Sequence, residues 1–211
     1  MNKFLVFMVV SCVNVLGPQI VQSAPIISVV SQPPPPNNQL PKVHIPGNVF
    51  VNINISGLGS DILGAFDLDV VYNPDFLVFT LGLSSPGTAL GTLSQGEAIA
   101  DLDSSTPGII NFAEVSLLEA SALDALQNDT FTLATLGFFA PTLPPAINQI
   151  ATTIGAGNFI FSDALGNEIV PQNPSAGAAI LLVPIPSTWL LFSVGLIGLW
   201  VTCRKRKMFA P

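Results

Sequence analysis

The sequence predicts an all-β protein, an antiparallel β-sandwich or jelly roll with one short helix, between two specialised ends. Apolar and polar residues alternate with period two along the middle of the chain, which is typical of strands with one buried face. Clusters of Gly, Pro, Asn, Asp and Ser separate these stretches. The chain has 211 residues. One globular domain of about 140 residues therefore fits between the ends.

The first 23 residues are predicted to be a secretory signal peptide. Lys3 precedes a mostly apolar run over residues 4–16, which is too short for a comfortable membrane span. Compact residues follow at the two positions that a signal peptidase reads, and they predict Ala24 as the first residue of the mature chain. The stretch VVSC, which ends at Cys12, loosely resembles a lipoprotein box, so lipid attachment there is the alternative.

Residues 24–46 are predicted to be a Pro-rich lead-in. Four consecutive prolines over residues 33–36 favour extended polyproline II and exclude a helix. We expect a stiff spacer before the domain, with a docking motif for a proline-binding module as the alternative. The only histidine of the chain, His44, lies here. A lone histidine in an extended segment is usually solvated or structural rather than catalytic.

Two segments, residues 48–56 and 64–72, show the strand alternation most clearly. In each, every second residue is apolar and Asn, Ser or Asp residues stand between them. Further strand candidates are residues 76–83, 108–117, 131–139 and 157–163. One helix is predicted over residues 117–126, where apolar residues recur at four-residue steps.

Four stretches of this middle region resemble cohesin-like domains. ISGLGSDILGAFDLDVVYNPDFLVF at 55–79 is similar to the opening hairpin of that family, and FTLATLGF at 131–138 to its central strand. FSDALGNEIV at 161–170 resembles its closing turn and strand, and VSLLEASALDALQND at 115–129 a helical insert of members with a sorting tail. The resemblance implies a cohesin-like sandwich over residues 47–182 with a binding or structural role, since cohesin domains are not enzymes.

The charge of the middle region limits its partners. All thirteen acidic residues lie between Asp61 and Glu168, whereas Lys42 is the only basic residue between the two ends. Such a surface repels phosphate backbones and anionic lipid headgroups, so nucleic-acid binding is excluded as a function. A well-solvated extracellular domain fits this composition.

The side chains that enzymes use are scarce. With one histidine, and with both cysteines in the apolar ends, Ser-His-Asp, Cys-His and histidine-based zinc sites are poorly supported. Asp67 and Asp69 stand two residues apart on a predicted strand, so they share a face and we expect both to point to water. A glycosidase-type carboxylate pair is the remaining enzymatic alternative.

Calcium is a better use for carboxylates in this sequence. Asp101 and Asp103 begin DLDSSTPG, which we expect to be a loop with serine oxygens nearby, and such oxygens suit a hard cation. The stretch lacks the EF-hand pattern. Asp101 and Asp103 are therefore candidate calcium ligands, with a solvated acidic loop as the alternative. No other cofactor is expected.

A sugar-stacking site is not visible in the middle region. Carbohydrate sites usually expose Trp or Tyr as flat platforms. Both tryptophans, Trp189 and Trp200, lie in the tail, and the only tyrosine, Tyr72, stands on the apolar face of its predicted strand.

The tail is predicted to cross a membrane. Residues 187–203 carry no charge and would form a helix about 25 Å long, at the lower limit of length for a hydrocarbon core of about 30 Å. Trp189 and Trp200 lie near its two ends, where interfacial aromatic residues belong. The basic cluster that would hold the C-terminus in the cytoplasm is Arg204, Lys205, Arg206 and Lys207.

The start of the tail resembles the PEP-CTERM sorting signal, in its VPLPA-type variant. The motif residues are Val183, Pro184, Ile185 and Pro186. Ile185 replaces the Glu of the commonest form, and Ser187 replaces the Ala of the variant. The resemblance over residues 183–207 implies a Gram-negative bacterial protein whose tail is recognised by an exosortase, a membrane transpeptidase or protease.

Two functions are predicted from these features. The first is a non-enzymatic exported protein of the cell surface or extracellular polysaccharide matrix, sorted by its tail, with a role in adhesion or biofilm. The alternative is a permanently membrane-anchored binding module for a polysaccharide or a dockerin-like partner.

Overall fold

The computed structural model describes residues 24–32, 34, 39–143, 147 and 149–185. The predicted signal peptide, the membrane helix over residues 187–203 and the basic cluster lie outside this part. Among the described residues, no helix is long and apolar enough to cross a membrane.

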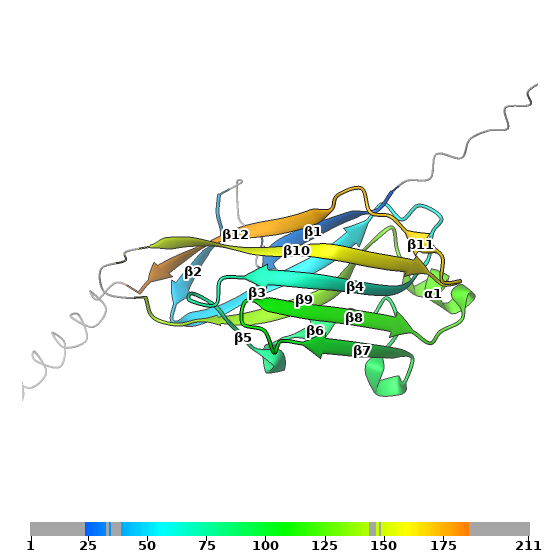
Figure 1. Ribbon diagram of the computed structural model, residues 1–211, viewed down its shortest axis with the longest axis horizontal. Coiled ribbons are helices and arrows are strands. Elements are labelled where there is room, and N and C mark those ends of the chain that lie inside the picture. Colours follow the sequence, from blue (N-terminus) through cyan, green and yellow to red (C-terminus); the bar gives the residue numbers. More distant parts are fainter. Residues whose placement is uncertain (1–23, 33, 35–38, 144–146, 148, 186–211) are drawn as a thin grey trace, which may run out of the picture.

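The described chain folds into two packed β-sheets (Figure 1). The smaller sheet has the order β1 (Ile26–Gln32), β3 (Gly47–Ser56), β9 (Thr130–Ala140) and β5 (Val78–Phe79), and β6 (Ser85–Pro86) also pairs with β9. The larger sheet has the order β2 (Lys42–Ile45), β12 (Ser175–Pro184), β10 (Ile150–Asp163), β4 (Leu63–Tyr72), β8 (Ile109–Ser116) and β7 (Ala98–Asp103), and β11 (Glu168–Ile169) also pairs with β10. Every pairing is antiparallel except that of β2 with β12, which is parallel.

The helical content is small. One α-helix, α1 (Ala120–Leu126), lies at one end of the sandwich and contacts β4 (Figure 1). Two short 3-10 helices, η2 (Leu81–Leu83) and η3 (Leu93–Gln95), interrupt the connections between strands. The predicted antiparallel sandwich with one short helix is therefore confirmed for the described residues.

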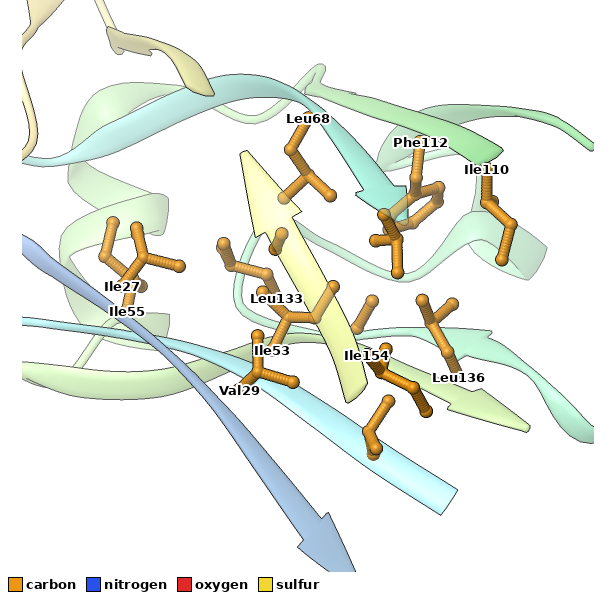
Figure 2. Packing of buried hydrophobic residues seen from close by; sticks show 14 of the residues in the cluster. Ile27, Val29, Ile53, Ile55, Leu68, Ile110, Phe112, Leu133, Leu136 and Ile154 are labelled. Atoms are coloured by element: carbon orange, nitrogen blue, oxygen red, sulfur yellow. The ribbon is translucent and has the colours of Figure 1, made fainter. Parts of the chain in front are cut away.

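The core fills the space between the two sheets. Alternate residues of β3, among them Ile53 and Ile55, point inward and belong to one buried cluster with Leu68 of β4 and Phe112 of β8 (Figure 2). All four are at most 2% exposed. Burying a side chain of this size contributes about 1.5–3 kcal/mol. The alternation that predicted the strands thus also supplies the core.

Two predicted elements are shorter than expected. Of residues 76–83 only Val78–Phe79 is a strand, because the next residues turn into η2, where Leu83 N–H donates to the carbonyl of Thr80 at 3.0 Å. The helix begins at Ala120 and not at residue 117. Glu119 is extended, with φ of −66° and ψ of 150°, and it caps the helix, so Leu117 and Leu118 lie before the helix begins. There Leu117 N–H donates to the backbone carbonyl of Glu97, and Leu118 N–H donates to the Ser116 hydroxyl.

The lead-in differs most from expectation. We expected residues 24–46 to precede the sandwich as a spacer, whereas β1 and β2 both lie in this segment and belong to the two sheets. Residues 26–32 alternate like the other strands, and Ile27 and Val29 point into the core.

Candidate functional site: the outer face of the larger sheet

Carboxylates gather on the outer face of the larger sheet. On β4, Asp67 and Asp69 alternate with the buried Phe66 and Leu68, so both carboxylates point away from the core. This confirms the prediction that they share a face. Asn111 of β8 stands directly opposite Asp69 in the strand register.

Amide groups hold these carboxylates in place. Asn111 Nδ2 donates to Asp67 Oδ1 at 2.8 Å and to Asp69 Oδ1 at 3.1 Å. Asn158 Nδ2 donates to Asp69 Oδ2 at 2.6 Å. Asn158 reaches this position from a bulge in β10, where its φ of 53° is left-handed, a conformation that Asn tolerates better than most residues. These hydrogen bonds therefore hold the two carboxylates in fixed orientations.

Asp101 and Asp103 lie on the same face but not in a loop. They belong to β7, which pairs with β8 along its length and places Asp103 opposite Asn111. The expected loop is therefore corrected to a strand that ends at Asp103. Asp103 Oδ1 accepts a hydrogen bond from the backbone N–H of Ser105 at 2.8 Å, and this bond lowers the pKa of the carboxyl below its ordinary value.

The calcium ligands predicted from the sequence do not form a metal-binding group. Within the described residues, no three or more His, Cys, Asp or Glu side chains are placed to hold a metal ion. Asp101 and Asp103 supply two carboxylates from one strand, whereas calcium takes six to eight oxygen ligands.

Exposed apolar residues surround the carboxylates. Five β-branched side chains on outward positions of the same four strands are between 40% and 64% exposed, namely Val71, Ile99, Ile109, Val115 and Ile160. Ile99 pairs with Val115, and Val71 pairs with Ile109. We call these five residues, together with Asp67, Asp69, Asp101, Asp103, Asn111 and Asn158, the outer-face patch. Apolar residues gathered on one face are typical of an interaction surface.

The outer face of the smaller sheet is different in kind. There Thr135 Oγ1 donates to Asn52 Oδ1 at 2.9 Å, and Thr132 Oγ1 donates to Asn54 Oδ1 at 2.8 Å. These neutral groups satisfy one another between neighbouring strands. The acidic and apolar combination is therefore a property of the larger sheet.

Neither His44 nor Tyr72 contributes to the patch. His44 is exposed on β2, which β12 and β10 separate from β4. The ring of Tyr72 packs against Phe138, with ring centroids 5.1 Å apart, as its predicted apolar position implies.

One buried carboxyl was missed at the level of the sequence. Glu114 of β8 is 1% exposed, and no hydrogen-bond partner reaches its Oε1. Desolvation by burial raises the pKa of Glu114 to about 7. The signal was available, because Glu114 follows Ile110 and Phe112 at two-residue steps and so occupies an inward position.

Comparison with known proteins identifies the fold. No known protein-family profile matches this chain, and no curated protein matches it either. A cohesin module from a family 33 glycoside hydrolase of Clostridium perfringens is similar in structure, with a TM-score of 0.55 and 9% identity, over 77% of this chain and 99% of the module. The chain has a cohesin-like fold.

Two further cohesins support this assignment. A type II cohesin domain from the cellulosome of Acetivibrio cellulolyticus has a TM-score of 0.55 and 17% identity, over 74% of this chain and 95% of that domain. The cohesin–dockerin complex Coh-OlpC-Doc435 from Clostridium thermocellum matches with a TM-score of 0.55 and 12% identity, over 77% of this chain and 97% of the matched chain.

The cohesin-like fold also includes the start of the predicted sorting motif. Val183 and Pro184 are the last residues of β12, and Ile185 follows directly. Pro186, together with Trp189, Trp200 and the basic cluster, lies outside the described residues.

Proposed function

We propose that this chain is a non-enzymatic exported protein whose cohesin-like domain binds a protein partner through the outer-face patch. The observation that carries the proposal is the patch itself. Its exposed β-branched residues offer apolar area, and its carboxylates are already oriented by Asn111 and Asn158. Burial of apolar area contributes affinity. Oriented charges fix the relative orientation of the two partners and raise the rate of association.

The charge of the domain indicates the chemistry of the partner. Lys42 is its only basic residue, against thirteen acidic residues. A partner segment that presents Lys or Arg beside apolar side chains complements such a surface. The similar structures include cohesins in complex with dockerins. A dockerin-like protein is therefore the partner class that we propose, with a polysaccharide as the alternative ligand.

The two ends supply the cellular context of the proposal. The signal peptide would direct the chain out of the cytoplasm, and an exosortase would recognise the tail from Val183 onward and remove it. The domain would then pass to the cell surface or the extracellular polysaccharide matrix, where adhesion or biofilm association is its proposed role. The alternative is a tail that is retained as a permanent membrane anchor.

Site-specific photo-crosslinking tests the binding surface. A crosslinking side chain that replaces Ile160 should capture a protein partner in the cells that produce this chain. The same probe at Ser28, on the outer face of the smaller sheet, is the matched control and should capture none. Equal capture from both faces, or capture from Ser28 alone, would remove the outer-face patch as the binding site.

Intact mass spectrometry tests the fate of the tail. The protein isolated from the native envelope and culture medium should end within or shortly after the motif that begins at Val183. A mass that still includes residues 187–211 would show that the tail is retained and would favour the anchored binding module.

A further inference from the structure

Strand β2 lies along the start of the sorting motif. It pairs in parallel with the end of β12 (Figure 1). In the register of this pair, Val183 stands opposite His44 and Pro184 opposite Ile45. Beyond the paired strands, Ile185 N–H donates to the carbonyl of Ile45 at 3.3 Å. Three of the four motif residues are thus paired with the lead-in that we had expected to be a spacer.

The other neighbour of β12 does not reach this far. β10 begins at Ile150, whose partner is Leu182, so the pairing of β12 with β10 ends before Val183. For Val183 and Pro184, β2 is the strand that pairs with them in the described chain. Removing β2 would therefore leave the motif backbone without a partner strand.

β2 is itself fixed to the sandwich at both ends. The carbonyl of Pro41 accepts from Leu181 N–H at 2.9 Å, and Ile45 is buried in the core. Gly47 then allows the chain to turn back into β3, because a Cβ at this position would overlap the carbonyl oxygen of His44. The strand is short, but it is held by packing as well as by hydrogen bonds.

We propose that β2 shields the first three residues of the motif from the processing enzyme. The most N-terminal peptide bond of the tail that this enzyme can cut in the folded protein is then set by β2. A processing enzyme must take substrate backbone in extended form, and here that backbone is already paired with β2. Hydrolysis breaks one peptide C–N bond and adds water, leaving a carboxylate on the domain and an amine on the released tail. In the folded protein, the bond that is cut lies after Ile185, because the peptide bonds before it are shielded by β2. The inference rests on the proposed processing of the tail.

Two proline substitutions distinguish this shielding from a general loss of structure. The carbonyls of Pro41 and Ile45 both point toward β12. Backbone groups alternate sides along a strand, so the N–H and carbonyl of Val43 also point toward β12, whereas those of His44 point to the open edge of the sheet. Val43→Pro removes an N–H on the paired side, whereas His44→Pro removes one on the open side. His44→Pro is therefore the matched control.

Hydrogen exchange on the full-length chain in mild detergent measures the shielding directly. We expect the amides of Val183 and Ile185 to exchange at least ten-fold more slowly in the wild type and in His44→Pro than in Val43→Pro. The amide of Ile53 in the core should stay protected in all three and so report an intact domain. Exchange of Val183 and Ile185 in the wild type at the rate of a free peptide would overturn the proposal.

Proteolysis gives a second reading that does not depend on the variants. Proteinase K applied to the folded wild-type protein should yield no product that ends between residues 182 and 184. Such products from the folded wild type would overturn the proposal. In cells, the processed protein should end at Ile185 or later, and an earlier end would also overturn it. A chain that retains residues 187–211 would refute the proposed processing, while the exchange rates would still decide whether β2 shields the motif.

Discussion

The side chain of Asn173 forms two hydrogen bonds with the backbone of Ile27, so that it replaces a neighbouring strand at the edge of β1. Its Oδ1 accepts from Ile27 N–H at 2.9 Å, and its Nδ2 donates to the Ile27 carbonyl at 2.8 Å. Ile27 is buried, and its partner on the other side is β3. Asn173 therefore satisfies backbone groups that the sheet leaves unpaired.

Asn173→Ala should destabilise the domain by about 1–3 kcal/mol, because it leaves a buried N–H and carbonyl without partners. Urea unfolding of the full-length chain measures the loss. Asn173→Asp, which keeps the acceptor and loses the donor, should lie between the wild type and Asn173→Ala. Equal stability of all three chains would show that water satisfies Ile27 equally well.

Glu114→Gln should change how stability depends on pH. The folded pKa of Glu114 is about 7, above its ordinary value of 4.5, so the folded state holds this proton more tightly than the unfolded state. The contribution of Glu114 is complete below pH 4.5 and is lost as the pH rises to about 7. The loss is up to about 3 kcal/mol, since each pKa unit corresponds to 1.36 kcal/mol. Wild type and variant should therefore unfold alike at pH 4.5, and the variant should be more stable at pH 8. Identical profiles from denaturant titrations would refute this.

Gly87→Ala should be strongly destabilising. A Cβ at Gly87 would overlap the backbone oxygen of Thr132, and backbone cannot move aside as a flexible side chain can. Overpacking of this kind costs about 1–3 kcal/mol. Gly82→Ala is the matched control, because nothing lies within 4 Å of the added carbon there. Thermal unfolding of both variants tests the prediction, and equal melting temperatures would contradict it.

The charge of the outer-face patch should control partner binding. The double change Asp67→Asn and Asp69→Asn removes two carboxylates while keeping side chains of the same shape. We expect the variant to bind a captured protein partner about ten-fold more weakly than the wild type does at low salt. Added salt should reduce the affinity of the variant less than it reduces that of the wild type. The matched control, Asp75→Asn with Asp124→Asn, makes the same change in net charge at exposed positions outside the patch. Equal weakening by both pairs would mean that only net charge matters.

Period-two alternation was sufficient to find the strands with large apolar residues. It placed β3 and β4 within a residue or two of their limits. β12 escaped notice because its inward residues include Ala176 and Ala178, which give a weak hydropathy signal. β2 escaped because four residues are too few to show a period, and its partner lies at the far end of the described chain.

The candidate site could be predicted only in part. The spacing of Asp67 and Asp69 fixed their shared face, since strand geometry alone determines it. Their neighbours Asn111 and Asn158 could not be assigned, because strand order and the bulge in β10 bring them together. Asp103 was placed in a loop because DLDSSTPG contains many turn residues, and only pairing with β8 extends the strand that far.

The position of β12 between β2 and β10 has a consequence for the order in which the protein is assembled. In a chain exported from its N-terminus, β2 emerges early and has no strand partner until residues 181–184 follow. Pairing between such distant segments is slow to form and is usually among the last steps of folding. The larger sheet would therefore close only when the tail is next to leave the export channel. Pairing of β2 with the end of β12 would therefore occur only after the whole domain has crossed the membrane, before a processing enzyme acts on the tail.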